Sequence, residues 1–255
     1  MRRAAAWRRV AVASSLLVLG SCGASAAPMP QGGGPAVSAR SVHDGDWTRF
    51  DFTAQRSGVG PTRTGITRRN LHALKTRVVG LDGTVDSSPI QLHRVLVRRR
   101  RRDVIFVTTT YGRTLAISAQ TGRRLWQFTP RDIGAYVGGP QITNTTPVAD
   151  PDRRYVYAAS PDGFIHKLRV SNGRSVWATK VTLDPAREKL GTALNIDGHS
   201  VVATTGGYDG DAPPYQGHVV LIDRASGRRT HVWNSLCSHR RRLIRPPSCP
   251  ASGRL

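Results

Sequence analysis

The sequence has few acidic residues, few cysteines and few aromatic residues, and each shortage excludes something. Only 16 aspartates and glutamates stand against 38 lysines and arginines in 255 residues. Few carboxylates are therefore left for a hard-cation site, which takes six to eight oxygens. The histidines, including His43, His93, His166 and His218, show no metal-ligand spacing such as His-x-x-x-His. No aromatic residues are interleaved with the arginine runs to stack on bases, so we do not predict specific nucleic-acid binding.

The apolar run near the N-terminus is too short to cross a bilayer. Val10 to Leu19 follows a stretch with four arginines and precedes small residues, which is the layout of a secretory signal over residues 1–26. Two processing routes stay open. Ala24-Ser25-Ala26 fits ordinary signal peptidase, whereas Leu19-Gly20-Ser21-Cys22 resembles a bacterial lipobox in which Cys22 would be lipidated. Either route predicts an exported protein, free or anchored at the cell envelope.

The three cysteines favour one disulfide. Whether Cys22 is lipidated or removed with the signal, Cys237 and Cys249 remain to pair, and an oxidising compartment permits that bond. Residues 27–45 are rich in glycine, proline, serine and alanine and are predicted to be a flexible tether. Residues 237–255 are rich in arginine and proline without strand periodicity, so we predict an irregular tail.

The formal net charge of +22 is concentrated in two arginine runs. One is Arg98 to Arg102, which lies in an insertion: Pro89 precedes Val104 by 15 residues, whereas Pro147 precedes Tyr155 by 8. We therefore predict that this run is a loop between two strands. The other run lies in the tail: Arg240, Arg241, Arg242 and Arg245. Such runs attract phosphate or anionic lipid.

A short pattern recurs three times, each time as a glycine turn followed by tryptophan. The copies are Thr121-Gly122 to Trp126, Asn172-Gly173 to Trp177, and Ser226-Gly227 to Trp233. They are separated by about 51 to 56 residues, a period typical of repeat architectures. In the third copy the tryptophan is two residues further from the glycine, which keeps it on the same face of a strand. We predict that the three tryptophans are structural and cover contacts between neighbouring repeats.

Each repeat contains four predicted strands. The first begins at Ser88-Pro89-Ile90 or Thr146-Pro147-Val148, where proline suits a strand's first residue. The second strands are Val104–Thr108, Tyr155–Ala158 and Val201–Thr205; the third are 113–119, 164–170 and the segment from Val219 to Arg224. The fourth strand carries the tryptophan. Four antiparallel strands per 50 residues predict an all-β fold, an incomplete β-propeller of about three to four blades over residues 46–236.

The stretch from Gly112 to Trp126 resembles the repeat of the pyrroloquinoline-quinone-type propellers, as does the entry from Asp46-Trp47 to Pro89. That family includes quinoprotein alcohol dehydrogenases and an outer-membrane assembly lipoprotein that binds no quinone. An active dehydrogenase of the family needs an aspartate base and a calcium ion, and often carries a vicinal disulfide. This sequence has no adjacent cysteines and few acids, so we predict no catalytic residues and no cofactor. The alternative is a protein that binds pyrroloquinoline quinone and calcium.

Two weak candidate sites stand out. Asp209 and Asp211 flank a glycine and offer two oxygen ligands, but the rest of a calcium-binding loop is missing, so a turn is the preferred interpretation. Asp86, Thr145 and Asn195 lie near the starts of the first strands, in the region that lines a propeller channel, and would either bind a ligand or cap strand ends.

Propellers close with about four to eight blades, and only three repeats are recognisable here. The segment Leu74 to Gly80 is expected to complete a blade elsewhere, and the chain is expected to be a truncated or frame-shifted relative of a longer propeller. The predicted function is an exported, non-catalytic scaffold that binds an envelope protein, peptidoglycan or a lipid surface. The alternative is a fragment of a quinoprotein dehydrogenase that oxidises an alcohol or a sugar.

Overall fold

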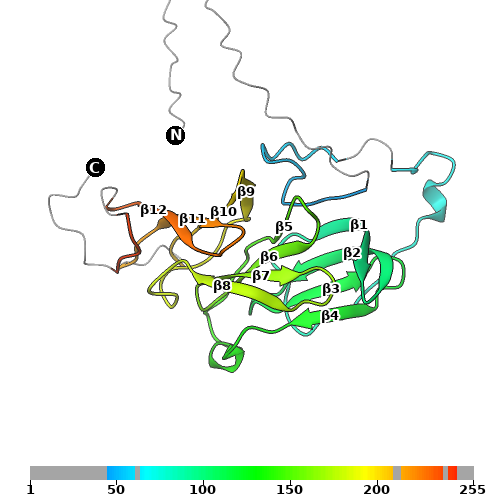
Figure 1. The fold of residues 1–255 in the computed structure, drawn as a ribbon. Coiled ribbons are helices and arrows are strands. Elements are labelled where there is room, and N and C mark those ends of the chain that lie inside the picture. The colour runs from blue at the N-terminus through cyan, green and yellow to red at the C-terminus, as the bar shows by residue number, and fades with distance from the viewer. Residues whose placement is uncertain (1–44, 61–63, 209–213, 238–240, 246–255) are drawn as a thin grey trace, which may run out of the picture. The chain divides into compact units, whose positions relative to one another are not determined.

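The computed structural model describes residues 45–60, 64–208, 214–237 and 241–245. These residues form three four-stranded antiparallel sheets in which spatial order follows chain order (Figure 1). Blade 1 consists of β1 (Ile90–Val97), β2 (Arg100–Thr108), β3 (Thr114–Ser118) and β4 (Arg124–Phe128); blade 2 of β5 (Val148–Ala149), β6 (Tyr155–Ser160), β7 (Phe164–Arg169) and β8 (Ser175–Lys180); blade 3 of β9 (Asn195–Asp197), β10 (Ser200–Thr204), β11 (His218–Asp223) and β12 (Arg229–Asn234). Two 3-10 helices, η1 (Leu71–Ala73) and η2 (Ile133–Ala135), complete the elements. The predicted all-β fold with four-stranded antiparallel blades is confirmed.

The glycine turn has the same backbone geometry in every blade. Gly122, Gly173 and Gly227 have φ of +71°, +73° and +76°, which glycine adopts more readily than other residues. Each donates its N–H over 2.8 Å to the carbonyl four residues earlier. The pairing between the third and fourth strands also shifts register near each turn, as a glycine bulge does. The repeat seen in the sequence is therefore a repeated hairpin.

Neighbouring blades pack face to face through the tryptophans. Trp126 lies over the turn of blade 2, where a Cβ added to Gly173 would come within 2.5 Å of the indole. Its Nε1–H donates to the Val170 carbonyl over 2.8 Å. Trp177 lies in the same way over Gly227 of blade 3, and its Nε1–H donates to the Arg224 carbonyl over 3.3 Å. Each contact between neighbouring blades therefore needs an indole on one blade and a glycine, which has no side chain, on the next.

The apolar core follows the same arrangement. One cluster joins blades 1 and 2 and includes Leu92, Phe106, Trp126 and Leu168. A second cluster joins blades 2 and 3 and includes Tyr157, Leu194, Val220 and Ile222. Burial thus occurs between sheets rather than within one sheet, which is why the repeats depend on one another.

Blade 3 leaves the corresponding face open. Trp233 pairs with Val219 and is 44% exposed, whereas Trp126 is 5% exposed. Val219 and Leu221, on the same face, are only partly buried. We call Trp233, Val219 and Leu221 the open face.

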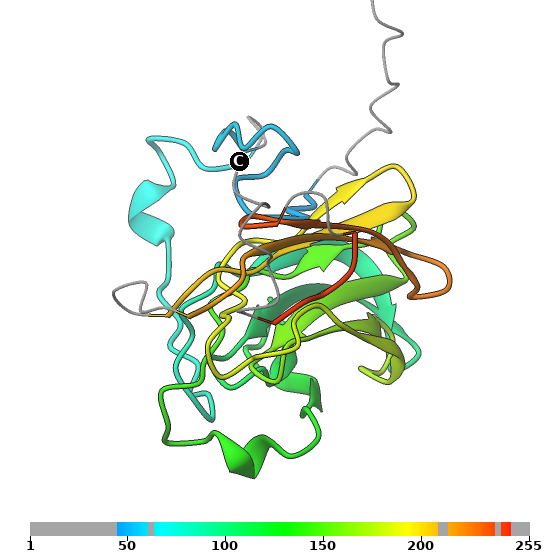
Figure 2. The ribbon, with the colours of Figure 1, turned by 90° about the vertical axis from the view of Figure 1, so that its left-hand side faces the viewer.

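The segment Leu74–Gly80 contains no strand in the structure. Its residues are exposed, and Val78 reaches 91%. In Figure 2 the cyan chain that carries η1 stands beside the sheets. Side-chain atoms of Arg77 and Val79 approach the Cβ position of Gly122 to 2.8 and 3.1 Å. Arg77 therefore occupies the place on blade 1 that an indole occupies on blades 2 and 3.

The prediction that Arg98 to Arg102 forms a loop is wrong. Arg100 to Arg102 belong to β2 and pair with Val97, Leu96 and Val95 of β1. Only Arg98 and Arg99 form the turn, with φ of +47° and +64°. Two positive φ values in a two-residue connection are those of a type I′ turn, whose twist matches that of the strands. The insertion therefore lengthens a hairpin, because the tight turn lets the extra residues pair.

This turn gives a stability prediction. Arg98→Asn together with Arg99→Gly should raise the free energy of unfolding by about 1 kcal/mol, since Asn-Gly suits a type I′ turn and arginine does not. Chemical denaturation measures the change. The matched control, Arg131→Ser with Arg187→Ser, also removes two exposed charges and should change stability by less than about 0.5 kcal/mol. A destabilised turn variant would contradict the assignment of the turn.

The described part of the tail packs against blade 3 without forming a strand. Leu243 and Ile244 are 8% and 6% exposed, and Leu243 joins the core between blades 2 and 3. Asn234 Nδ2 donates to the Arg242 carbonyl over 3.2 Å. Cys237 is fully buried and disulfide-bonded. Cys22 and Cys249 lie outside the described residues, so the Cys237–Cys249 pairing and lipidation of Cys22 stay predictions.

Candidate functional site

The N-terminal segment crosses the inner strands of all three blades. Trp47 and Gln91 of β1 exchange two backbone hydrogen bonds of 2.8 Å. The next residue, Thr48, accepts at its carbonyl from the Ala149 N–H of β5 over 2.8 Å, and the Arg49 guanidinium donates to Asn195 of β9. Residues 47–49 therefore line the side of the blades on which a propeller has its channel (Figure 1).

A cavity of about 370 Å³ lies beside this segment. It is lined mainly by apolar and aromatic groups, with one acid: Trp47, Phe50, Asp51, Ser88, Pro89, Ile90, Gln91 and Ile105. Trp47 is held edge-on against Phe52, with ring centroids 5.2 Å apart. Such a hollow suits a small apolar or aromatic group. No periodic pattern marks residues 47–51, so sequence reasoning missed this cavity.

The predicted channel residues do not form one site. Asp86 is exposed. Thr145 is fully buried, and its hydroxyl has no hydrogen-bond partner within the described residues. Asn195 Oδ1 accepts a hydrogen bond from the Arg49 guanidinium. Asp209 and Asp211 lie outside the described residues, so their metal-binding role stays untested.

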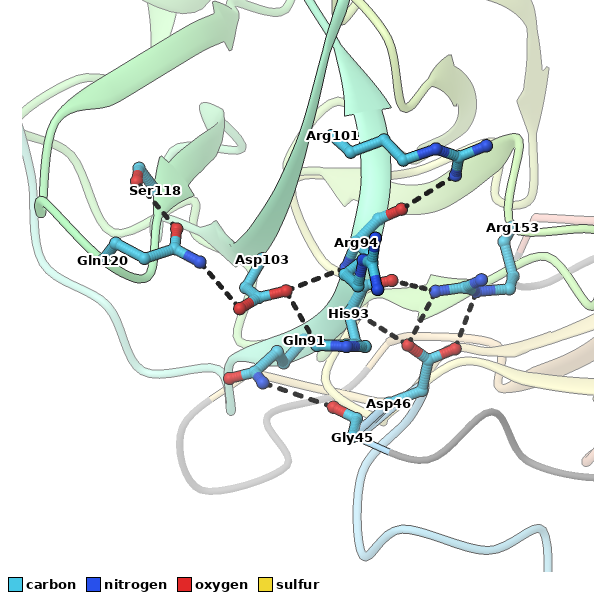
Figure 3. Close-up of polar contacts among 10 residues, drawn as sticks. All are labelled: Gly45, Asp46, Gln91, His93, Arg94, Arg101, Asp103, Ser118, Gln120 and Arg153. Carbon is cyan, nitrogen blue, oxygen red and sulfur yellow. Dashed lines mark hydrogen bonds and ion pairs between the residues drawn. The ribbon is translucent and has the colours of Figure 1, made fainter.

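An ion-pair network ties the N-terminal segment to blades 1 and 2 (Figure 3). Asp46 is 2% exposed, and Arg153 faces both its oxygens: Nε lies 2.8 Å from Oδ2, and Nη2 donates to Oδ1 over 3.0 Å. The His93 backbone N–H also donates to Asp46 Oδ1 over 2.6 Å, and Arg153 donates to the His93 carbonyl. Three separate parts of the chain therefore depend on one carboxylate.

Asp103 is the second centre of the network (Figure 3). Its Oδ1 lies 2.7 Å from His93 Nδ1 and accepts from the Arg94 backbone N–H over 2.8 Å. Its Oδ2 accepts from Gln120 Nε2 over 2.7 Å. These bonds hold the register shift of β1, where Arg94 has φ of +48°. The carboxylates of Asp46 and Asp103 are thus both engaged by groups of the chain, which indicates a structural role.

Two buried histidines contact possible catalytic partners but are closed to a substrate. Ser160 Oγ lies 2.6 Å from His166 Nε2 and also donates to Asp162. Ser160 is fully buried, and the His166 ring lies 4.8 Å from the Phe128 ring and 6.3 Å from the Phe164 ring. A serine without access cannot attack a substrate, so this contact is a core hydrogen bond.

The second buried histidine, His218, pairs with Glu188 in blade 3. Glu188 Oε2 lies 3.1 Å from His218 Nδ1, and both side chains are fully buried. The Gln216 N–H donates to Glu188 Oε1 over 2.9 Å, and the Thr182 hydroxyl donates to Oε2. The Ile244 N–H lies 3.5 Å from His218 Nε2, which brings the tail onto the pair. The cluster joins the β8–β9 loop, β11 and the tail.

Burial lowers the pKa of His166 to about 4, which makes stability depend on pH. The unfolded histidine titrates near 6.5, so His166 contributes full stability above pH 6.5 and loses it as the pH falls toward 4. The expected loss from this residue is about 2 to 3 kcal/mol between pH 7 and 4. Chemical denaturation at several pH values should show a shallower dependence for His166→Gln. An equal pH dependence of stability in the parent and in His166→Gln would refute the lowered pKa of His166.

Comparison with known proteins identifies the repeat. A family model of the PQQ-like repeats, described as the outer membrane protein assembly factor BamB, matches residues 81–246, which is most of the chain and includes all three blades. The chain belongs to the PQQ-like repeat propeller family. No curated protein matches this propeller-repeat protein significantly.

Two solved dehydrogenase structures show the same fold. The quinohemoprotein alcohol dehydrogenase of Comamonas testosteroni has 17% identity and a TM-score of 0.59, over 78% of this chain and 28% of its own. The dehydrogenase ADHIIG of Pseudomonas putida HK5 has 18% identity and a TM-score of 0.59, over 75% and 27%. BamB from Moraxella catarrhalis has 18% identity and a TM-score of 0.40, over 60% and 50%. The propeller-repeat protein thus spans just over a quarter of the two dehydrogenases.

Binding of pyrroloquinoline quinone and calcium by the described residues stays the alternative prediction. Among them there is no group of three or more histidine, cysteine, aspartate or glutamate side chains placed to hold a metal. On the channel side, Arg49 binds the Asn195 oxygen, and burial, followed by the nearby Arg56, lowers the Arg49 pKa. In the described part of the chain, no helix is both long and apolar enough to span a membrane.

Proposed function

We propose that this chain is an exported, non-catalytic propeller-repeat protein that binds a protein partner at the bacterial cell envelope. The observation that carries the proposal is the match of residues 81–246 to a family described as an outer membrane protein assembly factor. The predicted signal over residues 1–26 supports export. Lipidation of Cys22 would add an anchor.

The open face supports protein binding. Trp126 of blade 1 is buried and Trp177 of blade 2 is partly buried against the turn of the next blade, whereas Trp233 is 44% exposed among Val219 and Leu221. Aromatic residues are enriched where proteins bind one another, because they bury much area at low entropic cost. A partner that offers a glycine hairpin would meet on this face the same chemistry that joins the blades.

The channel side supports a role without catalysis. Residues 47–49 bind the inner strands of the three blades, and the Arg49 guanidinium donates a hydrogen bond to the Asn195 side chain. The buried histidine contacts, Ser160–His166 and Glu188–His218, are closed to solvent. Of the polar groups that sequence reasoning placed near the channel, Asp86 is exposed, Thr145 is fully buried and Asn195 binds Arg49.

Crosslinking in cells tests the proposal. A photoreactive amino acid at Trp233 should give a discrete adduct with an envelope protein, whereas the same group at Arg131, an exposed residue of the β4–β5 connection, should not. The adducts are resolved by electrophoresis and identified by mass spectrometry. Absence of an adduct at Trp233, or equal adducts at both positions, would overturn the proposal.

A second candidate, a fragment of a quinone-dependent dehydrogenase, is favoured by the fold shared with two quinohemoprotein alcohol dehydrogenases. It predicts that pyrroloquinoline quinone and calcium bind the purified protein and that an alcohol or sugar then reduces a dye. We expect no shift in quinone absorbance and no dye reduction. A stoichiometric shift with turnover would establish the dehydrogenase instead.

A further inference from the structure

Exposed arginines from separate segments gather at one end of blades 1 and 2, where their strands turn. Four residues, which we call the turn patch, define it: Arg98, Arg99, Arg154 and Arg169. The first two form the β1–β2 turn. Arg154 lies in the β5–β6 turn, and Arg169 ends β7. The turns between first and second strands and between third and fourth strands lie at the same end of each blade, so these four residues lie at one end of the blades.

Two backbone hydrogen bonds hold the turns of the patch together. The Arg98 N–H donates to the Ser171 carbonyl over 3.2 Å, which fixes the blade 1 hairpin against the β7–β8 turn of blade 2. The Val170 N–H donates to the Arg154 carbonyl over 2.9 Å, which joins the two turns of blade 2. The concentration of charge is therefore built into the fold, although its members are up to 71 residues apart.

The Tyr155 ring lies at the blade 2 end of the patch. Lys167 Nζ is 4.1 Å from the ring centroid, and the guanidinium carbons of Arg154 and Arg169 are 5.8 and 5.9 Å away. The aromatic face attracts these cations and lowers the cost of holding them near one another. Lys167 is only 7% exposed and donates to the Arg224 carbonyl, so the surface charge beside the ring comes from Arg154 and Arg169.

Few carboxylates of the described chain lie near the patch: Asp152 shares the β5–β6 turn with Arg154, and Asp223 lies near Lys167. Within the described residues none of its four arginines makes an ion pair. Asp46 and Asp150 are bound by Arg153 and Arg224, and Asp103 is bound by His93 and its neighbours. The four arginines are exposed and outnumber the two acids beside them, so the patch keeps a net positive charge toward solvent.

One exposed apolar residue lies within the same hairpin. Leu96 lies two residues before Arg98 and is 55% exposed. It pairs with Arg101 of the neighbouring strand. A leucine flanked by arginines is typical of surfaces that lie in the headgroup region of a bilayer, where apolar groups enter the acyl boundary and cations meet phosphate. A site for one free phosphate or for nucleic acid has no use for this side chain.

We propose that the turn patch and Leu96 bind the headgroup region of an anionic lipid surface. The charges project from turns across two blades instead of converging on a cavity, which suits a surface of many anions. Each arginine near such a surface contributes to binding, and Leu96 adds apolar area. The inference rests on the proposed location at the envelope, where such lipids are present.

Vesicle sedimentation tests the proposal with the full chain carrying Cys22→Ser, so that no acyl chain accounts for binding. The protein should sediment with phosphatidylcholine vesicles that contain phosphatidylglycerol and not with phosphatidylcholine alone. Binding should fall at about 1 M salt, where the Debye length is about 3 Å. The Arg98→Asn, Arg99→Gly variant, expected to fold at least as well, should bind roughly 10- to 30-fold more weakly.

The control variant, Arg131→Ser with Arg187→Ser, removes two exposed charges from the opposite end of the blades and should bind within about twofold of the parent. Leu96→Ser should weaken vesicle binding and leave retention on duplex DNA unchanged. Equal losses in the two arginine variants, competition by millimolar inorganic phosphate, or tighter binding to DNA than to vesicles would overturn the proposal. The assay contains only protein and lipid, so failure to find a protein partner through Trp233 would not affect it.

Discussion

Trp126→Ala is expected to lower the free energy of unfolding by about 3 to 5 kcal/mol. The indole is 5% exposed, lies 5.7 Å from the Phe106 ring, and covers Gly173 of the next blade. Its removal leaves a cavity between blades 1 and 2 and an unpaired Val170 carbonyl. Chemical denaturation followed by circular dichroism measures the loss.

The matched control is Trp233→Ala. The same residue type occupies the corresponding strand of blade 3, but it is 44% exposed, so the expected loss is about 0.5 kcal/mol or less. Comparable losses for the two variants would mean that the indole contributes through its own strand rather than through the blade joint. Gly173→Ala should act like Trp126→Ala, because a Cβ there would clash with the indole at 2.5 Å.

Asp46→Ala should cost about 3 kcal/mol and detach the N-terminal segment from the blades. The substitution leaves the Arg153 guanidinium, whose side chain is 20% exposed, without its carboxylate, and it removes the acceptor of the His93 N–H. Breaking a largely buried pair costs more than its net contribution to stability, since the remaining charge stays desolvated. Denaturation gives the loss, and limited proteolysis reports the release of residues 45–60.

A double-mutant cycle separates this ion pair from simple packing. Asp46→Ala with Arg153→Ala should be less destabilising than the sum of the single changes, by about 1 to 3 kcal/mol. Asp46→Asn keeps an acceptor for the His93 N–H and should cost less than Asp46→Ala. Strict additivity of the two alanine variants would show that Asp46 and Arg153 do not depend on each other.

The strands were predictable because their signals are local. Runs such as 104–108 and 155–158 combine β-branched and aromatic residues with glycine turns at a fixed spacing, and both lie within strands of the structure. The prediction for Arg98 to Arg102 failed because the extra residues between Pro89 and Val104 were interpreted as a loop, whereas most of them extend the two strands. Pairing along a hairpin depends on the backbone, which tolerates exposed arginines at the edge of a blade.

The contacts around the channel could not be predicted in the same way. Asp46 meets Arg153 across 107 residues, and Arg49 meets Asn195 across 146. Neither pair shares a spacing or a motif. The buried pair Glu188 and His218 likewise comes from a loop and a strand whose encounter depends on how blade 3 folds.

The sequence alone determined the repeat, the all-β class and the four-stranded blade, because periodicity, turn glycines and strand propensity act within a few residues. Only the tertiary structure decided which face of each blade is covered, which arginines share a surface, and where the N-terminal segment lies. Those properties arise from packing between blades, in which each contact joins residues far apart in the chain.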